Sequence, residues 1–491
     1  MPRSCFINGS VISGKQTLRT DVLVENGVIT ALGDHRAFAL SPQDSLIDCT
    51  GKLLFPGIID AHCHIQLDTG IFHTEDDWWI GSQEAARGGI TSVIDFVGPN
   101  PGENLRHALD FRLNQAQKSL IDYTFHMTVL DDTEQSLEGI DKCPEWGISS
   151  LKIYTTYRPN YYLDDLAILH ILERAKNAGL ITLIHCENDA IVTHAAQTVR
   201  SRFDLSKPGN LWKCHPLLRP EIAEVEAAER MIRLSDYTHA PIVIAHNSSD
   251  ETVQMIAKAK ALGSCIFNET GPQYLCLNSN DNSPVTQYAQ IDDAFVQVEP
   301  DGSLDDADEG LEEKNHEPWR YILQPPLREF FTQSGLCNEV TAGHVDMLIT
   351  DHCAYTRAQK TADPQNTPGG LPGFETLLPV TAAIDGMTWQ RLAQMLCENP
   401  AQIYGLWPRK GAIAPGFDAD IVILRDEEYQ IDEAKLHGFA GYSPFHGHQA
   451  RGIIECVFRR GEEIIRNGVI TAAEGTGCFL HASRAAAEEQ E

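Results

Sequence analysis

The stretch Leu54-Phe-Pro-Gly-Ile-Ile-Asp-Ala-His-Cys-His64 joins an apolar, β-branched run to two histidines. Seven further runs of this kind follow it, and amphipathic stretches with helical periodicity separate them. Strands that alternate with helices predict a parallel sheet, and eight such units predict a (β/α)8 TIM-like barrel of the α/β class. The eight predicted strands are 54–60, 90–96, 123–129, 149–154, 181–185, 242–246, 265–270 and 347–351.

The two ends of the chain have a different pattern, with short alternating strands and Asn-Gly turns at Asn8-Gly9, Asn26-Gly27 and Asn467-Gly468. We predict that both ends pair into one small β-sandwich domain. Residues 1–53 form its N-terminal part and 412–472 its C-terminal part, while 54–411 form the catalytic barrel and 473–491 a tail. Within the barrel, 278–318 is polar and acidic and too long for an ordinary loop, so we predict an insertion there.

The charge of the chain limits its partners. Lys and Arg number 38 against 69 Asp and Glu, a net charge of −31 over 491 residues. This balance argues against non-specific binding to nucleic acid and against docking on anionic lipid. No run suits a signal peptide or a membrane span, and the 13 scattered cysteines fit free thiols. We therefore expect a cytoplasmic protein.

Four of the predicted strands end in side chains that bind metals. His62 and His64 follow the first strand, and His185, His246 and Asp351 end the fifth, sixth and eighth. Active sites of such barrels lie at the carboxyl ends of the strands. Imidazole and carboxylate suit zinc and its first-row neighbours. His62 and His64 can share one ion, because residues two apart on an extended segment face the same way.

Lys152 lies in the fourth predicted strand, within Ser-Leu-Lys-Ile-Tyr. An ammonium group among metal ions would be repelled, so this lysine must be neutral or modified. Burial favours loss of its proton. The neutral amine can then take up carbon dioxide and become a carbamate, an anion able to bridge two metals.

Each of these residues, taken alone, has a simpler interpretation. A strand-end histidine is more often structural, and a single lysine such as Lys152 more often extends to the surface. Six such residues at five strand ends favour metal binding over these alternatives. We interpret the neighbouring Cys63, Cys186 and Cys353 as packing residues.

Longer motifs resemble the dihydropyrimidinase and hydantoinase family of cyclic amidohydrolases, over nearly the whole chain. The motifs are Asp60-Ala-His-Cys-His64, Lys152-Ile-Tyr-Thr-Thr-Tyr157, His185-Cys-Glu-Asn-Asp189, Glu269-Thr-Gly-Pro-Gln-Tyr-Leu275, Pro325-Pro-Leu-Arg328, Thr350-Asp-His-Cys353 and Asn399-Pro-Ala-Gln-Ile-Tyr-Gly-Leu406. The resemblance implies a homotetramer with two divalent ions, Zn²⁺ preferred. His62, His64 and Asp351 would hold one ion, His185 and His246 the other, and N6-carboxylated Lys152 would bridge both.

The resemblance also implies a reaction. Hydroxide shared by the two cations is available near neutral pH and attacks the ring carbonyl carbon. Tyr157 and one zinc ion stabilise the oxyanion, and Asp351 carries a proton to the leaving nitrogen. We therefore predict ring opening of dihydropyrimidines or 5-substituted hydantoins to N-carbamoyl amino acids.

Two positions depart from the family pattern. Gln324 stands where a Ser is usual, directly before Pro-Pro-Leu-Arg, and Gly369 stands near a usual Asn. Main-chain groups there grip cyclic substrates in the family, so we predict that Gln324 and Gly369, with Tyr157, contact the substrate. The bulk of Gln324 could reshape the pocket.

The sequence also bears on the choice of substrate. Dihydroorotases and allantoinases usually have an Arg shortly after the two histidines, but the stretch 65–70 here contains none, which favours an uncharged ring. Hydrolysis of another cyclic amide (an imide, allantoin or a lactam) is the alternative, and a non-catalytic interaction protein of the same fold is a weaker one. Aromatic residues are predicted to shape the pocket for the ring substituent, although Trp78 and Trp79 equally fit packing; the set is Phe72, Trp78, Trp79, Phe96, Tyr161 and Tyr162.

Overall fold

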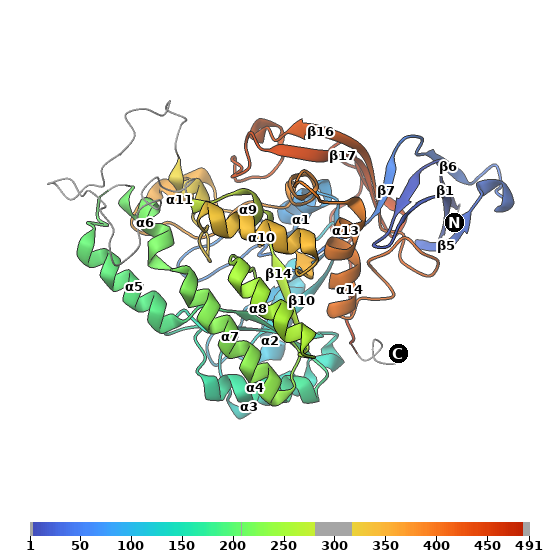
Figure 1. Ribbon diagram of the computed structural model, residues 1–491. Helices are drawn as coiled ribbons and strands as arrows, with labels where there is room; N and C mark the ends of the chain where they lie inside the picture. Colours follow the sequence, from blue (N-terminus) through green and yellow to red (C-terminus); the bar gives the residue numbers. More distant parts are fainter. Residues whose placement is uncertain (1–2, 208, 280–316, 485–491) are drawn as a thin grey trace, which may run out of the picture.

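The centre of the molecule is an eight-stranded parallel sheet in the order β15-β14-β13-β12-β11-β10-β9-β8. The computed structural model describes residues 3–207, 209–279 and 317–484 (Figure 1). Each strand pairs in parallel with the next along the chain, which confirms the predicted (β/α)8 TIM-like barrel. The strands are β8 (Ile58–Asp60), β9 (Ile90–Val97), β10 (Asp122–Thr128), β11 (Ser150–Tyr154), β12 (Ile181–His185), β13 (Ile242–Ile244), β14 (Ile266–Thr270) and β15 (Met347–Leu348).

Hydrogen bonds just beyond β8 and β15 join the first and last strands of the barrel. Asp60 Oδ1 accepts from Thr350 N at 3.1 Å. Asp351 N donates to His62 O at 2.9 Å, and His64 N donates to His352 O at 2.7 Å. The segments that carry His62, His64 and Asp351 are therefore held side by side through their backbones.

Helices cover the outside of the barrel, where Figure 1 shows α4, α7, α8 and α10. Ser249 caps α8, since its side chain accepts from Thr252 N. Asp77 provides the N-cap of α1 by accepting from Ile80 N. The helices are α1 (Trp78–Arg87), α2 (Leu105–Ala116), α3 (Glu134–Lys142), α4 (Asp165–Asn177), α5 (Asp189–Arg202), α6 (Asn210–Leu218), α7 (Glu221–Thr238), α8 (Asp250–Ala261), α9 (Pro272–Cys276), α10 (Phe330–Ala342), α11 (Arg357–Ala362), α12 (Leu377–Ala382), α13 (Trp389–Ala393) and α14 (Asn399–Ile403).

The two chain ends form two further sheets, with strand orders β5-β4-β1-β6 and β19-β18-β17-β16-β7-β2-β3. Rings of Phe6 and Phe458, one from each sheet, lie 4.9 Å apart between them. This confirms the predicted small β-sandwich built from both ends. Its strands are β1 (Ser4–Ile7), β2 (Ser10–Ile12), β3 (Thr17–Arg19), β4 (Asp21–Glu25), β5 (Val28–Gly33), β6 (Ser45–Asp48), β7 (Leu53–Pro56), β16 (Ile421–Gln430), β17 (Gln449–Arg459), β18 (Glu462–Arg466) and β19 (Val469–Ile470).

The predicted first barrel strand, 54–60, is wrong as a single element. Its first half belongs to β7, which pairs with β16 in the sandwich, and only β8 belongs to the barrel. Gly57 separates the two, and a Cβ there would lie 2.2 Å from Thr91 Oγ1. The apolar character of residues 54–60 does not reveal that the two halves of this stretch pair in different sheets. The domain limits after residues 53, 411 and 472 stay predictions.

Parts of two predicted segments, the insertion 278–318 and the tail 473–491, lie outside the described residues, at 280–316 and 485–491.

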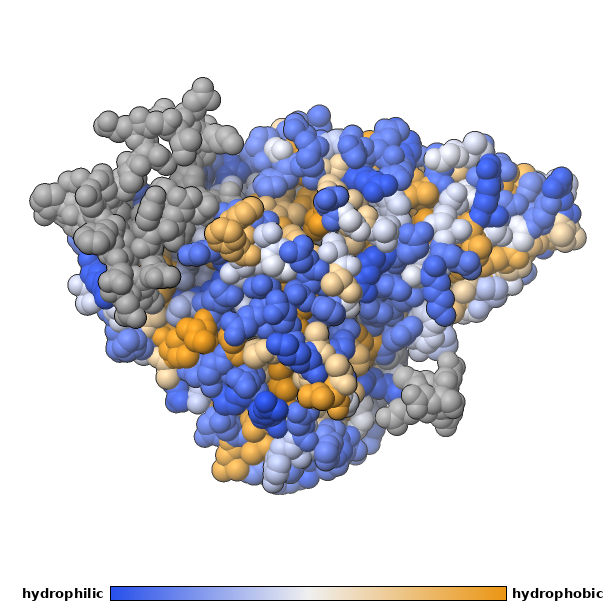
Figure 2. Space-filling view, viewed as in Figure 1, coloured by the Kyte–Doolittle hydropathy of each residue, from blue (hydrophilic) through white to orange (hydrophobic). Residues whose placement is uncertain are grey.

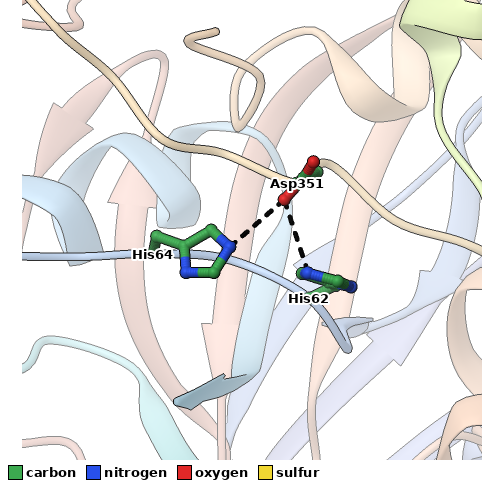
Figure 3. A group of neighbouring side chains, drawn as sticks. All are labelled: His62, His64 and Asp351. Carbon is green, nitrogen blue, oxygen red and sulfur yellow. Dashed lines mark ion pairs between the residues drawn. The ribbon is translucent and has the colours of Figure 1, made fainter. Parts of the chain in front are cut away.

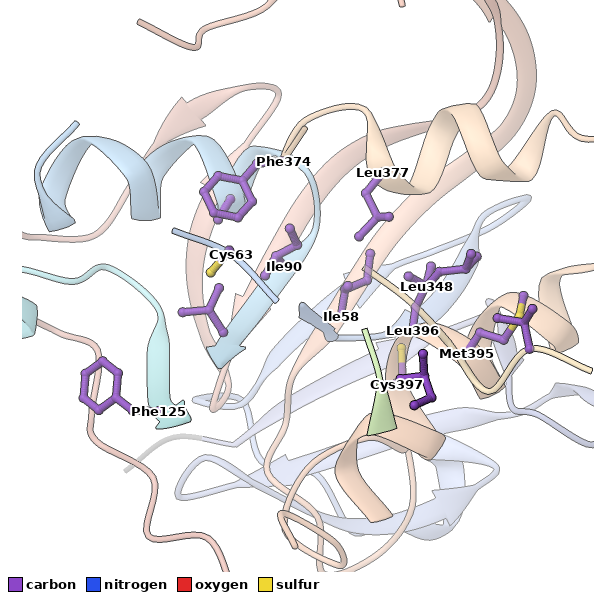
Figure 4. Packing of buried hydrophobic residues seen from close by; sticks show 14 of the residues in the cluster. Ile58, Cys63, Ile90, Phe125, Leu348, Phe374, Leu377, Met395, Leu396 and Cys397 are labelled. Carbon is purple, nitrogen blue, oxygen red and sulfur yellow. The ribbon is translucent and has the colours of Figure 1, made fainter. Parts of the chain in front are cut away.

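The largest hydrophobic core contains side chains from β8, β15, α12 and the segment before α14. Among them are Ile58, Leu348, Leu377 and Leu396, which pack together in Figure 4. Hydrophilic residues dominate the face in Figure 2. None of the helices described is long and apolar enough to cross a membrane.

A buried ionic cluster joins the barrel to the sandwich. The Nζ of Lys410, 1% exposed, lies 2.8 Å from Asp122 Oδ2, 2.7 Å from Asp420 Oδ2 and 3.0 Å from Asp418 Oδ2. Arg460 also contacts Asp122, at 2.5 Å. Burial works against the charge of Asp122, but Lys410 and Arg460 bring its pKa below the ordinary value. Its stabilising contribution is therefore present at neutral pH and is lost as the pH falls through the lowered pKa.

We predict that Lys410→Met lowers the melting temperature, because it leaves buried carboxylates without their cation. Breaking a buried ion pair in this way costs about 3–5 kcal/mol. Calorimetry at pH 7 measures the change, with Lys435→Met as control, since the Lys435 side chain is 82% exposed. Equal melting temperatures for the two variants would contradict the prediction.

Candidate metal centre and active site

The first group of candidate ligands is His62, His64 and Asp351. Each offers a ligand atom, and these atoms all lie within 4.8 Å of one another. The Nε2 atoms of His62 and His64 lie 3.4 and 3.3 Å from Asp351 Oδ1 (Figure 3). Both rings thus point at one carboxylate oxygen, an arrangement in which one cation could be shared.

The second group is His185, the last residue of β12, and His246, two residues beyond β13. Their ring centroids lie 4.4 Å apart, and His246 lies 5.3 Å from His62. Burial lowers the pKa of His62, His185 and His246, so these imidazoles are neutral and keep a free lone pair. The Nδ1 of His246 is buried and has no hydrogen-bond partner among the described residues.

Lys152 lies in β11 with its side chain directed into the same region, and is 1% exposed. Its Nζ lies 5.3 Å from the ring of Phe96 and 5.1 Å from that of Tyr154. The Phe96 ring in turn lies 4.8 Å from His62 and 4.7 Å from His64. Burial lowers the pKa of Lys152 to about 8, and the amine makes no hydrogen bond within the described part of the chain. The structure thus brings all six predicted ligands together.

These residues fit a pair of divalent cations. The neutral imidazoles converge with the Asp351 carboxylate, and one of their nitrogens is buried without a partner. A buried polar atom without a partner is costly unless a ligand completes it. A lysine that gives up its proton easily suits a site for cations, whereas an ordinary ammonium would not.

Two buried glutamates orient the histidines. Glu269 Oε1 bonds to Nδ1 of His62, and Glu187 Oε2 bonds to Nε2 of His185 at 2.7 Å. Such a bond fixes the ring and leaves its other nitrogen for a metal. Arg219 Nε donates to Glu187 Oε1 at 3.0 Å, so the charge of Glu187 is balanced by a guanidinium. Both glutamates lie in recognisable motifs, but no sequence spacing reveals which histidine each contacts, and Arg219 carries no local signal.

The three predicted substrate contacts also lie together, beside His185. Tyr157 Oη donates to Gln324 Oε1 at 2.9 Å and lies 3.4 Å from His185 Nε2. Gln324 Cδ lies 3.5 Å from where a Cβ on Gly369 would be. Burial raises the pKa of Tyr157, so the phenol keeps its proton and can donate a hydrogen bond.

Backbone strain is concentrated in this region. Tyr157, His246 and Asp351 have φ angles of 73°, 33° and 51°, in a region that residues with side chains rarely adopt. Each such residue costs on the order of 1–3 kcal/mol and persists only where its surroundings hold it. Three of the predicted site residues therefore have directions that regular strands would not give them.

The predicted aromatic lining is correct only in part. Phe96 lies against His62 and His64, as described above. Trp78 is fully buried on α1 and packs instead against Tyr123 and Phe125, with centroids 5.4 and 5.9 Å away. For Trp78 the packing alternative is the correct one.

Comparisons with known proteins agree with this geometry. The Amidohydrolase family matches residues 334–464. A D-phenylhydantoinase from Escherichia coli O9:H4 is 34% identical over 486 residues, covering 96% of each chain. The solved dihydropyrimidinase from Brevibacillus agri superposes with a TM-score of 0.87 at 28% identity, over 98% of this chain and 99% of the other. A D-hydantoinase (dihydropyrimidinase) from Thermus sp. gives 0.85 at 27% identity, with the same coverage. Because the similarity spans almost the full length of both chains, this protein belongs to the hydantoinase and dihydropyrimidinase family and is a cyclic amidohydrolase.

Proposed function

We propose that this enzyme opens the ring of dihydropyrimidines or 5-substituted hydantoins and releases N-carbamoyl amino acids. The observation that carries the proposal is the convergence of four imidazoles, Asp351 and a buried Lys152 at the carboxyl ends of the barrel strands, next to Tyr157. The names of the similar proteins, D-phenylhydantoinase and dihydropyrimidinase, support the same substrates.

We propose that the residues hold two divalent cations, with zinc preferred for its affinity for imidazole. His62, His64 and Asp351 would hold one, His185 and His246 the other, and N6-carboxylated Lys152 would bridge both. When bound, the cations supply Lewis-acid chemistry, which lowers the pKa of water and polarises a carbonyl.

The residues of the chain then have distinct tasks. Water adds to the ring carbonyl carbon, the ring C–N bond breaks, and one water proton moves to the leaving nitrogen. Asp351 would accept that proton and deliver it, since its carboxylate lies at the centre of the ligand group. Tyr157 would donate its hydroxyl proton as a hydrogen bond to the carbonyl oxygen as negative charge develops.

An uncharged ring fits the site better than a carboxylate-bearing one. The guanidinium of Arg219 lies 4.9 Å from the Tyr157 ring, but Glu187 already neutralises it. A substrate carboxylate would therefore have to compete with a buried ion pair. Hydrolysis of another uncharged cyclic amide, such as an imide, is the second candidate.

We also propose a cytoplasmic homotetramer. The family resemblance supports the assembly, and the strongly acidic composition supports a location away from nucleic acid and anionic lipid surfaces. Sedimentation of the purified protein tests the subunit number.

Lys152→Ala should lose metal and activity together, because it removes the group proposed to bridge the ions. Metal analysis by mass spectrometry should fall from two equivalents of zinc per chain to one or none. Lys142→Ala, in which an exposed lysine is removed, serves as control. Full metal content in Lys152→Ala would contradict the bridging role.

Tyr157→Phe should keep its metal and slow the chemical step. Loss of one hydrogen-bond donor to an oxyanion lowers kcat by roughly 10²–10³-fold. Steady-state kinetics give the comparison, and Tyr237→Phe, which removes the hydroxyl of an exposed tyrosine on α7, should change kcat little. Unchanged turnover in Tyr157→Phe would remove its proposed role.

A substrate panel tests the proposed ring. Dihydrouracil, hydantoin and 5-phenylhydantoin should be opened, and allantoin, dihydroorotate and succinimide should react more slowly. Liquid chromatography of the N-carbamoyl products provides the measurement. Turnover confined to the second set would overturn the substrate assignment and leave the metal site intact.

A further inference from the structure

Hydrogen bonds from buried side chains hold the backbone on both sides of Gln324. The carbonyl groups on both sides of it accept hydrogen bonds from side chains that are themselves buried. The pairs are Lys360 Nζ to Ile322 O at 2.7 Å, His215 Nε2 to Leu323 O at 2.7 Å and Tyr274 Oη to Pro325 O at 3.0 Å. The backbone of residue 324 is therefore fixed in position, and its side chain lies beside Tyr157.

The Gln324 carboxamide uses only half of its hydrogen-bonding capacity. Oε1 accepts from Tyr157 Oη at 2.9 Å. Nε2 lies on the far side, 3.7 Å from where a Cβ on Gly369 would be, and has no hydrogen-bond partner among the described residues. Because residue 369 is a glycine, no side chain covers this Nε2 from that direction. Two amide protons are thus available to a ligand.

Along the wall these groups form an ordered series of donor, acceptor and donor. Tyr157 Oη donates, Gln324 Oε1 accepts and Gln324 Nε2 donates. The complementary series of acceptor, donor and acceptor is an edge in which two carbonyl groups flank one N–H. A cyclic imide or ureide presents this edge, whereas a simple lactam has only one carbonyl.

We propose that Gln324 is a specificity-determining residue that selects rings with two carbonyls flanking an N–H. Its Oε1 accepts from the ring N–H and its Nε2 donates to the carbonyl that is not attacked. This inference rests on the proposed function, because it takes Tyr157 to bind the carbonyl that is attacked.

When such a ring binds, every donor and acceptor of Tyr157 and Gln324 in this series has a hydrogen-bond partner. In the free protein the Tyr157 hydroxyl donates a hydrogen bond to Gln324 Oε1. When a ring binds, its N–H replaces Tyr157 as the donor to Oε1. The Tyr157 hydroxyl then donates to the scissile carbonyl oxygen. A lactam offers no acceptor to Nε2 and forgoes this hydrogen bond, which should weaken binding by at least about tenfold.

Two planar rings that resist ring opening test the proposal. Uracil presents the edge with two carbonyls, and 2-pyridone presents one carbonyl and the N–H. Calorimetric titration of the metal-loaded protein should give a Kd for uracil at least about tenfold lower than for 2-pyridone. Equal affinities, or no binding of either ring, would overturn the proposal.

Two variants test whether the preference for uracil over 2-pyridone depends on the Gln324 carboxamide. Gln324→Met removes both hydrogen-bonding groups, and Gln324→Glu keeps an acceptor for Tyr157 but cannot donate. Both should bring the two Kd values to within about threefold of each other, with metal content and circular dichroism unchanged. Gln365→Glu, the same change in a neighbouring exposed loop, should keep the preference. A preference that survives in Gln324→Met or Gln324→Glu would overturn the proposal.

The binding measurement needs no turnover, so its result is separate from the proposed function. Loss of the uracil preference in both variants supports the role of Gln324 even if no dihydropyrimidine or hydantoin is hydrolysed. Ring opening of dihydrouracil with an unchanged preference in the variants supports the proposed function and rejects the role of Gln324.

Discussion

The hydrogen bonds that join the first and last barrel strands are the constraint on which the site depends. Asp351 N donates to His62 O, and His64 N donates to His352 O, so residues almost 290 positions apart share one backbone ladder. Backbone hydrogen bonds leave little freedom of position. The three side chains of the first ligand group are therefore brought together by closure of the barrel, and the left-handed φ of Asp351 turns its carboxylate toward both rings.

Burial then gives the site its chemical character. It lowers the pKa of three histidines, so the region contains neutral imidazoles. It also lowers the pKa of Lys152 to about 8, so this amine loses its proton more readily than an ordinary lysine. Glu269 and Glu187 each hold one ring nitrogen, and Arg219 neutralises Glu187. The polar groups that remain, including the Nδ1 of His246, lack partners among the described residues. The proposed cations would complete such groups.

The substrate side of the site is built differently. Tyr157 and Gln324 belong to loops, and what holds them is a set of side chains that bond to backbone carbonyls, such as Lys360 and His215. None of Tyr157, Gln324, Lys360 and His215 is one of the six candidate metal ligands. A change of residue at 324 or 369 can therefore alter which ring is bound while the barrel and the metal ligands stay as they are, which fits the departure of these two positions from the family pattern.

Sequence patterns alone predict the barrel, the sandwich from both chain ends and the six candidate ligands. They do so because the carboxyl ends of parallel strands meet at one mouth of a barrel. They do not show that the run 54–60 divides between two sheets, since an apolar strand looks the same whichever sheet it joins. Nor do they reveal the partners of Glu187, Glu269 and Arg219, or that Trp78 packs away from the pocket. Only the tertiary structure decided these, because each depends on contacts between segments that lie far apart in the chain, and local patterns carry no record of such contacts.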